Sequence, residues 1–120
     1  MHNFRELKIW QEAMEIAKST YKITKSFPSS ETYGLVSQMN RAAVSIPSNI
    51  AEGAGRNGNR EFAQFLNTAM GSCFELETQL LLAYEFSYIR KEELELFIQN
   101  INKLEKMINA LNSTLRKQLV

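Results

Sequence analysis

Few residues of this chain could carry out chemistry, and they lie far apart in the sequence. The 120 residues include one histidine, His2, and one cysteine, Cys73. A Ser-His-Asp triad and a Glu-x-x-His di-iron site both need histidine inside the fold, whereas His2 lies at a terminus, where chains commonly fray. A zinc site needs several Cys or His ligands. We therefore expect no catalytic residue, no metal-binding residue and no cofactor.

Carboxylates are the remaining candidates for acid–base chemistry. Glu75 and Glu77 are two positions apart, which places them about 200° apart on a helix, so they do not face each other. Glu52 is the best single candidate for an unusual carboxylate because it neighbours a proline inside a helical pattern. A salt bridge between Glu52 and Arg41 or Arg56 is the simpler interpretation. The sequence thus predicts a protein that is not an enzyme.

The glycine-containing stretch GAGRNG, residues 53–58, could suggest a phosphate-binding loop. It follows a helical pattern instead of a strand, and it lacks the Gly-Lys-Ser/Thr ending that such loops carry. We expect Gly55 or Gly58 to adopt the left-handed conformation that ends a helix. The stretch is therefore interpreted as a turn.

Four segments must position these residues, because apolar side chains recur at three- and four-residue steps in four places. The four sets are Leu7, Trp10, Met14, Ala17 and Tyr21; Val36, Met39, Ala43, Ile46, Ile50 and Gly53; Phe62, Leu66, Ala69, Cys73, Leu76, Leu80 and Ala83; and Leu94, Phe97, Ile101, Leu104, Ile108, Leu111 and Leu115. Such spacing is typical of helices that pack nearly parallel in bundles.

The joints between the segments are short. SFPSSE ends the first helix at Pro28, with Ser29 or Ser30 as the cap of the second. GRNGN precedes the third helix, with Asn59 as its cap, and SYIRKEE places two glutamates, Glu92 and Glu93, in the first turn of the fourth. Short connections make consecutive helices antiparallel. The sequence predicts one all-α domain over residues 1–120, an antiparallel up-down four-helix bundle.

Pro47 lies inside the second segment, where a proline costs on the order of 3 kcal/mol. The apolar register nevertheless continues across it, which predicts one long helix kinked at Pro47. A polar face beside that register and the small alanines around it favour an oligomer interface, with a solvent-exposed face as the alternative. The expected interface residues are Arg41, Ser45, Pro47, Ser48 and Glu52, and the small residues are Ala42, Ala43, Ala51 and Ala54.

Two helices carry more apolar surface than one bundle core needs. The additional stripes are Ile9, Ala13, Ile16, Ile23 and Phe27 on the first helix, and Phe65, Phe74, Leu81 and Tyr88 on or after the third. A wide core with large aromatics would absorb them, but unpartnered apolar surface more often marks a contact between proteins. The pattern favours a homo-oligomer.

The charge balance restricts the possible partners. The formal net charge is +1, with 44% hydrophobic and 22% charged residues, which is short of the basic character of a dedicated nucleic-acid binder. Binding to nucleic acid would need local clustering, or repetition of one patch around an oligomer. No apolar stretch approaches the roughly 20 residues of a membrane span, and the N-terminal region does not read as a signal peptide. We expect a cytoplasmic protein without a membrane partner.

Three blocks resemble a known family: FRELKIWQEA, VSIPSNIAEG and EFAQFLNTAMGSCFELETQL. The family comprises four-helix-bundle proteins encoded in intervening sequences of bacterial 23S ribosomal RNA genes. The resemblance implies an up-down bundle and a ring-shaped homopentamer. The chain is also similar to the accessory variability determinant proteins of diversity-generating retroelements, which bind nucleic acid and a reverse transcriptase. It departs from relatives at Asn40 and at Asn57–Asn59, where they often carry more basic residues, and fewer cations weaken phosphate contacts.

The functional hypothesis is a non-enzymatic homo-oligomeric assembly protein that binds RNA or other nucleic acid through a repeated basic surface. The alternative is an adaptor that docks a protein partner and does not itself contact nucleic acid. A solvated face that keeps the protein soluble is the competing interpretation of the basic residues. The candidate nucleic-acid contacts are Lys18, Lys22, Lys25, Arg41, Arg56 and Arg60.

Overall fold

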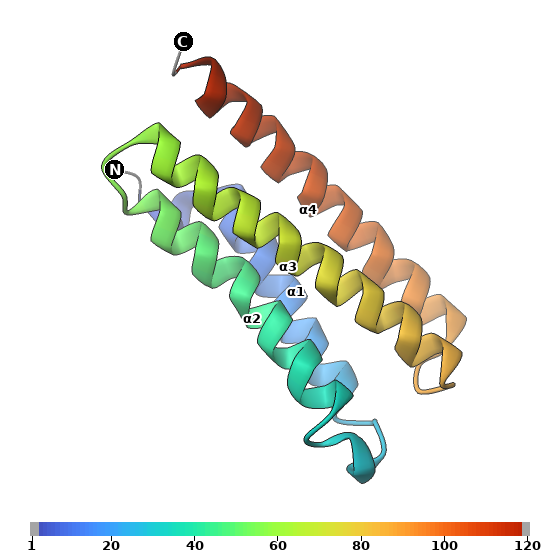
Figure 1. Ribbon diagram of the computed structural model, residues 1–120. Coiled ribbons are helices and arrows are strands. Elements are labelled where there is room, and N and C mark those ends of the chain that lie inside the picture. The colour runs from blue at the N-terminus through green and yellow to red at the C-terminus, as the bar shows by residue number, and fades with distance from the viewer. Residues whose placement is uncertain (1–2, 119–120) are drawn as a thin grey trace.

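The computed structural model describes residues 3–118 and contains four long helices, with no strand among those residues. Consecutive helices run in opposite directions (Figure 1), as an up-down bundle requires. Two short 3₁₀ helices, η1 and η2, precede α1 and α2. The bounds are η1 Phe4–Glu6, α1 Lys8–Thr24, η2 Ser29–Glu31, α2 Leu35–Ala54, α3 Asn59–Glu85 and α4 Lys91–Lys117. The predicted all-α four-helix architecture is confirmed.

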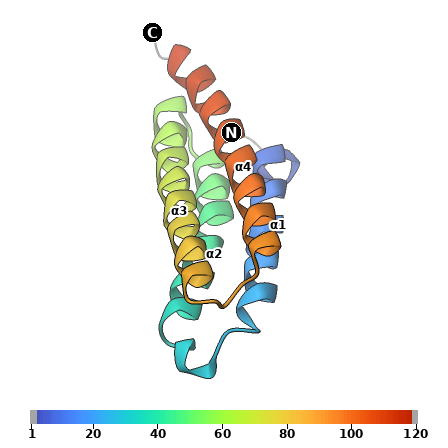
Figure 2. The same ribbon diagram turned by 90° about the vertical axis from the view of Figure 1, so that its right-hand side faces the viewer.

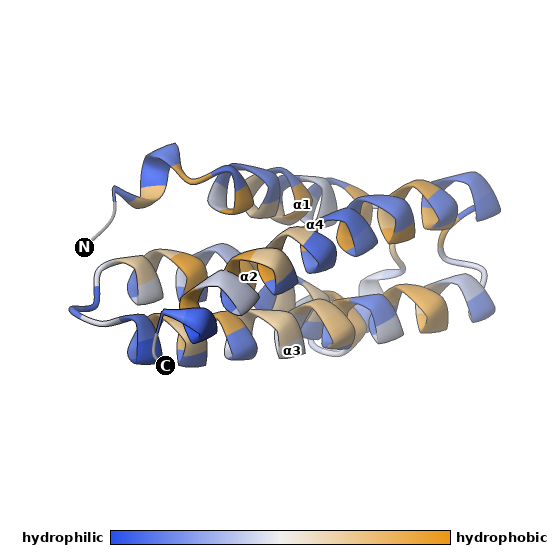
Figure 3. Cartoon of the chain, turned by 90° about the horizontal axis from the view of Figure 1, so that it is seen from above, coloured by the Kyte–Doolittle hydropathy of each residue, from blue (hydrophilic) through white to orange (hydrophobic). Residues whose placement is uncertain are grey.

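Each helix packs against its neighbours around a square. α1 contacts α2 and α4, and α3 contacts α2 and α4, so α1 lies diagonally across the core from α3 and α2 from α4 (Figures 2 and 3). The apolar sets predicted for α2, α3 and α4 fill this core. Its largest fully buried side chains are Met39, Ile46, Ile50, Leu66, Leu76, Leu80, Ile101, Leu104 and Ile108. No helix within residues 3–118 is both long and apolar enough to cross a membrane.

On α1 the predicted core stripe is mostly wrong: Ala17 is its one buried member in α1, and the additional stripe faces the core instead. The first three members of the additional stripe, Ile9, Ala13 and Ile16, are buried. In the predicted stripe, Trp10 and Met14 are only partly buried and Tyr21 is 47% exposed. The buried stripe continues through two threonines, Thr20 and Thr24, which a count of apolar residues overlooks. Thr20 is tolerated inside because its hydroxyl donates to the Ile16 carbonyl at 2.8 Å. The surplus apolar face of α1 therefore consists of Trp10, Met14 and Tyr21.

Several predicted helix ends are also wrong. Ser29 begins η2, and the N-cap of α2 is Gly34 with no side-chain cap, so neither Ser29 nor Ser30 caps α2. The N-cap of α3 is Gly58 and Asn59 is its first residue. No glycine in residues 3–118 has a positive φ, so Gly55 and Gly58 do not end a helix in the left-handed conformation; Gly55 is the C-cap of α2 in a right-handed conformation.

The left-handed helix end occurs at Ser87, after α3, with φ of 64°. The amide of Tyr88 donates to the carbonyl of Ala83 and the amide of Ser87 to that of Tyr84, the paired bonds of a Schellman motif. Glycine is the usual residue in this conformation, and serine is an unusual one. The end of α3 therefore carries no glycine that could mark it in the sequence.

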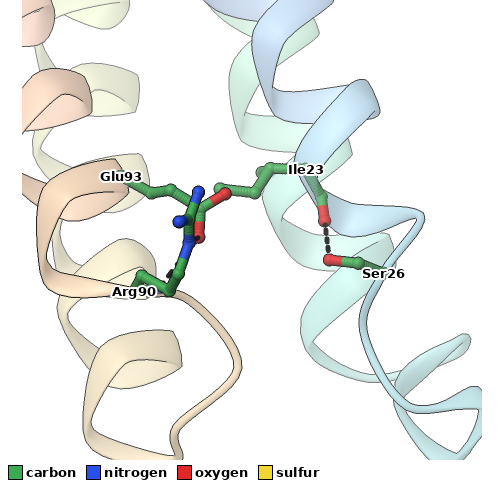
Figure 4. A network of polar contacts seen from close by, with 4 residues as sticks. All are labelled: Ile23, Ser26, Arg90 and Glu93. Atoms are coloured by element: carbon green, nitrogen blue, oxygen red, sulfur yellow. Dashed lines mark hydrogen bonds and ion pairs between the residues drawn. The ribbon is translucent and has the colours of Figure 1, made fainter.

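The start of α4 agrees with the prediction, since its first turn contains Glu92 and Glu93. The Glu93 carboxylate accepts from the backbone amide of Arg90 at 2.9 Å and from its Nε at 3.4 Å. Figure 4 shows this pair near the end of α1, where the Ser26 hydroxyl donates to the Ile23 carbonyl at 2.8 Å. Both helix ends are thus closed by local side-chain hydrogen bonds.

α2 continues through Pro47, as its unbroken register predicts, from Leu35 to Ala54. The kink at Pro47 stays a prediction. The proline ring is buried, as are Ala43 and Ile46 before it and Ile50 after it. The segment is therefore one helix used for packing and not two helices joined by a loop.

α2 and α3 approach each other closely at Gly53. A Cβ at this position would lie 2.7 Å from Cβ of Phe65 and 3.0 Å from the Phe62 ring. Ala42, Ala43 and Ala54 are also fully buried in the core, so these small residues of α2 pack inside the same chain. Side chains cannot be enlarged at this contact without moving one helix.

Alanine at two glycines should change stability in opposite directions. Gly53→Ala is expected to lower the free energy of unfolding by about 1–2 kcal/mol, because overpacking against Phe65 outweighs the helix propensity gained. Gly71→Ala is the matched control, since a Cβ there meets nothing within 4 Å on an exposed part of α3. This variant should raise the free energy of unfolding by roughly 0.5–1 kcal/mol. Urea titration followed by circular dichroism measures both. Equal effects would contradict the close α2–α3 contact.

Candidate functional site

A groove of about 800 Å³ runs along the bundle between α1 and α2. The surplus face of α1 forms one wall, with Trp10, Met14 and Tyr21. Val44 and Pro47 belong to the opposite wall, and Val44 is 42% exposed. The remaining lining residues are Ala17, Lys18, Lys22, Lys25, Ser48 and Ala51. We name this feature the α1–α2 groove.

The α1–α2 groove has apolar walls and a cationic side. Lys18, Lys22 and Lys25 are exposed members of its lining, and residues 16–30 contain no acidic residue. Lys18 forms an ion pair with Glu15 one turn earlier, but both side chains are 67% exposed, so this pair neutralises the lysine only weakly. The arrangement can bind a partner that presents apolar side chains beside negative charge.

The residues expected at an oligomer interface lie in three different places. Pro47 and Ser48 line the α1–α2 groove. Ser45 instead contacts Ser72 of α3 at 2.8 Å between the hydroxyl oxygens, and Arg41 pairs with Glu75 of α3 at 3.3 Å. Glu52 pairs with Arg56 of the α2–α3 turn at 4.0 Å, four residues further along the chain.

The six candidate nucleic-acid contacts do not form one surface. The three lysines line the α1–α2 groove, and Arg41 is paired with α3. Arg56 lies within 4.0 Å of Glu52 and of Glu61, and its guanidinium is 5.0 Å from the centre of the Phe65 ring. Arg60 is exposed in the first turn of α3. Only Arg56 and Arg60 share one end of the bundle.

At that end the fold brings in cations that the sequence analysis missed. Arg116 and Lys117 occupy the last turn of α4, and this turn lies at the same end as the α2–α3 turn and the N-terminal segment (Figures 1 and 3). Three hydrogen bonds join the end of α4 and its C-cap to α3 there: Asn59 to Gln118 at 2.5 Å, Asn112 to Asn67 at 2.7 Å and Arg116 to Asn67 at 3.5 Å. We name Arg56, Arg60, Arg116 and Lys117 the basic end. The up-down topology together with the basic last turn of α4 was the signal that could have found it.

Cys73, Glu77 and Glu105 form a group of titratable side chains between α3 and α4. Burial raises the pKa of the Cys73 thiol to about 12, so the thiol is not reactive near neutrality. Burial, a hydrogen bond with Glu77 and the Glu77 charge raise the pKa of Glu105 to about 7. One buried oxygen of each glutamate has no hydrogen-bond partner within residues 3–118, and a proton held by Glu105 can join the two carboxyl groups.

This carboxyl pair was missed by the sequence analysis because it depends on the register of α4 against α3. It lies apart from the α1–α2 groove, and we regard it as a structural pair. In the described part of the chain, no three His, Cys, Asp or Glu side chains are grouped to hold a metal ion. His2 lies outside the described residues.

Comparisons with known proteins relate this chain to one family. The family model of the 23S rRNA-intervening sequence proteins matches residues 5–110. A crystal structure of a protein of unknown function from the S23 ribosomal protein family of Bacteroides thetaiotaomicron superposes with a TM-score of 0.78, at 22% identity over 87% of this chain and 97% of that chain. The curated proteins include no match. Neither the family description nor that structure indicates a catalytic activity.

Stability should fall as the pH rises through neutrality, and Glu105 should be the cause. Because folding raises the pKa of Glu105 from 4.5 to about 7, the folded state holds a proton that the unfolded state releases. The resulting stabilisation is complete below pH 4.5 and is lost as the pH passes 7. Glu105→Gln should flatten the stability profile between pH 5 and 8, and at pH 8 it should be more stable than wild type by about 1 kcal/mol, a value reduced for partial solvent access.

Thermal and urea unfolding across this pH range test the expectation. Glu85→Gln, at the exposed end of α3, removes a carboxylate without touching the pair and should leave the slope unchanged. A wild-type profile that is level from pH 5 to 8 would show that the two glutamates do not share a proton.

Proposed function

The chain belongs to the 23S rRNA-intervening sequence protein family, and we propose that it is a non-enzymatic assembly protein that forms a homo-oligomer and binds RNA or other nucleic acid. The family resemblance adds that the oligomer is a ring of five copies. The buried Cys73 and the structural role of the Glu77–Glu105 pair support a role without catalysis.

The basic end is the observation that carries the nucleic-acid part of this proposal. Arg56, Arg60, Arg116 and Lys117 come from two helix ends that the fold places together, and Lys8 begins α1 at the same end. Arginine and lysine at such density attract phosphate, and their affinity comes mainly from release of counterions. Glu52 and Glu61 offset part of this charge through their pairs with Arg56.

Self-association brings together the positive charge that a single copy lacks for binding RNA. A net charge of +1 gives a single chain little attraction for RNA at a distance. In a ring whose bundles stand side by side in one orientation, every basic end lies on the same face, so each copy adds its phosphate contacts to those of its neighbours. A long nucleic acid would therefore bind the ring more strongly than a short one.

The apolar walls of the α1–α2 groove favour the adaptor as a second candidate. Aromatic and aliphatic walls suit a protein partner better than a phosphate backbone. An affinity pulldown from the native host distinguishes the two functions. A stoichiometric protein that is retained after nuclease treatment, without any direct RNA binding by the purified chain, would favour the adaptor.

Removing two cations from the basic end should weaken RNA binding. The double variant Arg60→Gln and Lys117→Gln is expected to lower the slope of log affinity against log salt concentration by about 2, roughly one for each lost phosphate contact. Gel shift and fluorescence anisotropy with structured RNA across a salt series measure this slope. Binding should weaken to a similar extent for different RNA sequences, because phosphate contacts carry no sequence information.

The matched control removes two lysines elsewhere. Lys91→Gln lies at the first position of α4, at the opposite end, and Lys106→Gln lies on the exposed side of α4. This control should keep more of the wild-type slope than the basic-end variant does. No detectable RNA binding by the wild-type protein at low salt would contradict the proposed function.

A further inference from the structure

We infer that the outer face of α3 docks into the α1–α2 groove of a second copy of the chain. This inference rests on the self-association in the proposed function and specifies which surfaces meet. The docking face consists of Phe74, Thr78, Leu81 and Glu85, which follow one another at steps of three and four along α3. We name it the α3 ridge.

The α3 ridge exposes large apolar side chains that the bundle does not cover. Phe74 is 55% exposed and Leu81 is 47% exposed, although a fully buried core residue directly precedes each of them on the same helix. They are seven residues apart and so lie on one side of α3. Exposed pairs of this kind, on a helix that is otherwise well packed, mark a contact with another protein.

The ridge and the groove lie on opposite sides of the bundle. Asn67 is seven residues before Phe74, and its side chain accepts a hydrogen bond from Asn112 of α4 at 2.7 Å, so the ridge borders α4. The groove lies between α1 and α2, and neither α1–α3 nor α2–α4 is a contacting pair among the described helices. A contact that joins two different surfaces is head-to-tail, and it closes into a ring when the rotation permits.

The charges of the two surfaces are complementary. Residues 16–30, which contain the α1 side of the groove, include three lysines and no acidic residue. Residues 62–89, which contain the ridge, include three glutamates and neither lysine nor arginine. Glu75 pairs with Arg41 of α2 and Glu77 lies against Glu105 of α4, so Glu85 is the acidic residue of the ridge. Glu85 at the end of the ridge is exposed and can face the lysines of a neighbour.

The lengths also agree. The groove follows α1 from Trp10 to Lys25, about 22 Å at 1.5 Å per residue, and the ridge from Phe74 to Glu85 is about 16 Å long. A helix that lays an apolar face into a groove of two other helices is a common form of recognition. The ridge is therefore shorter than the groove, so the length of the groove is sufficient for it.

Two variants, each blocking one surface, test the pairing. Val44→Lys places a charge inside the groove, and Leu81→Lys places one on the ridge, where it would meet the lysines of the neighbour. Both positions are exposed in the chain, so the fold should be retained, which circular dichroism checks. Each variant alone should have the monomer mass of 13.8 kDa by light scattering.

Mixing the two variants gives the decisive result. Each retains the surface that the other has lost, so an equimolar mixture should form one contact and stop at a heterodimer of twice 13.8 kDa. Leu96→Lys changes an apolar residue of α4 that is 59% exposed and lies outside both surfaces, and it should keep the wild-type mass. A mixture that remains monomeric, or single variants that keep the wild-type mass, would overturn the pairing.

The outcomes separate this inference from the proposed function. An oligomeric wild type whose mass neither variant changes refutes the pairing and leaves the assembly function intact. A monomeric wild type refutes both. Loss of RNA binding by Val44→Lys, with its mass unchanged, would assign the groove to nucleic acid and overturn the pairing.

Discussion

The close contact between α2 and α3 is the constraint on which the other features of this bundle depend. Gly53 leaves no space for a Cβ against Phe65, and Ala42, Ala43 and Ala54 of the same helix are fully buried. The small residues of α2 are therefore used inside the chain. Toward α1 the packing is more open. Trp10, Met14 and Tyr21 of α1 face Val44 and Pro47 of α2 across a groove that no side chain fills. A tight side and an open side on the same helix produce the α1–α2 groove.

Pro47 lies on the open side of α2. Its ring is buried and also forms part of the groove wall. Proline has no backbone N–H, so this position has no hydrogen-bond donor that needs a partner. The helix continues past it because the register of core residues is the same before and after it. The cost of a proline inside a helix is thus offset by burial of its ring in the bundle and not by a special loop.

Much of this fold could be predicted from the sequence because the core of a bundle follows helical periodicity. The sets on α2, α3 and α4 are correct, and so is the continuity of α2. On α1 two apolar stripes compete, and buried threonines that satisfy their hydroxyls locally decided between them. The Glu77–Glu105 pair and the basic end could not be read from spacing alone, because each joins residues of two helices whose relative register only packing determines. The surplus apolar surface was predicted correctly for Phe74 and Leu81.

The proposed assembly uses the sides of the bundle for copies of the chain and one end for nucleic acid, so the two functions do not compete for the same residues. The measurement that tests this account most directly is the solution mass of the wild-type protein by light scattering at micromolar concentration. The account predicts a single species whose mass is a whole multiple of 13.8 kDa, greater than two, as a closed head-to-tail ring requires. A mass of 13.8 kDa at all accessible concentrations would contradict it.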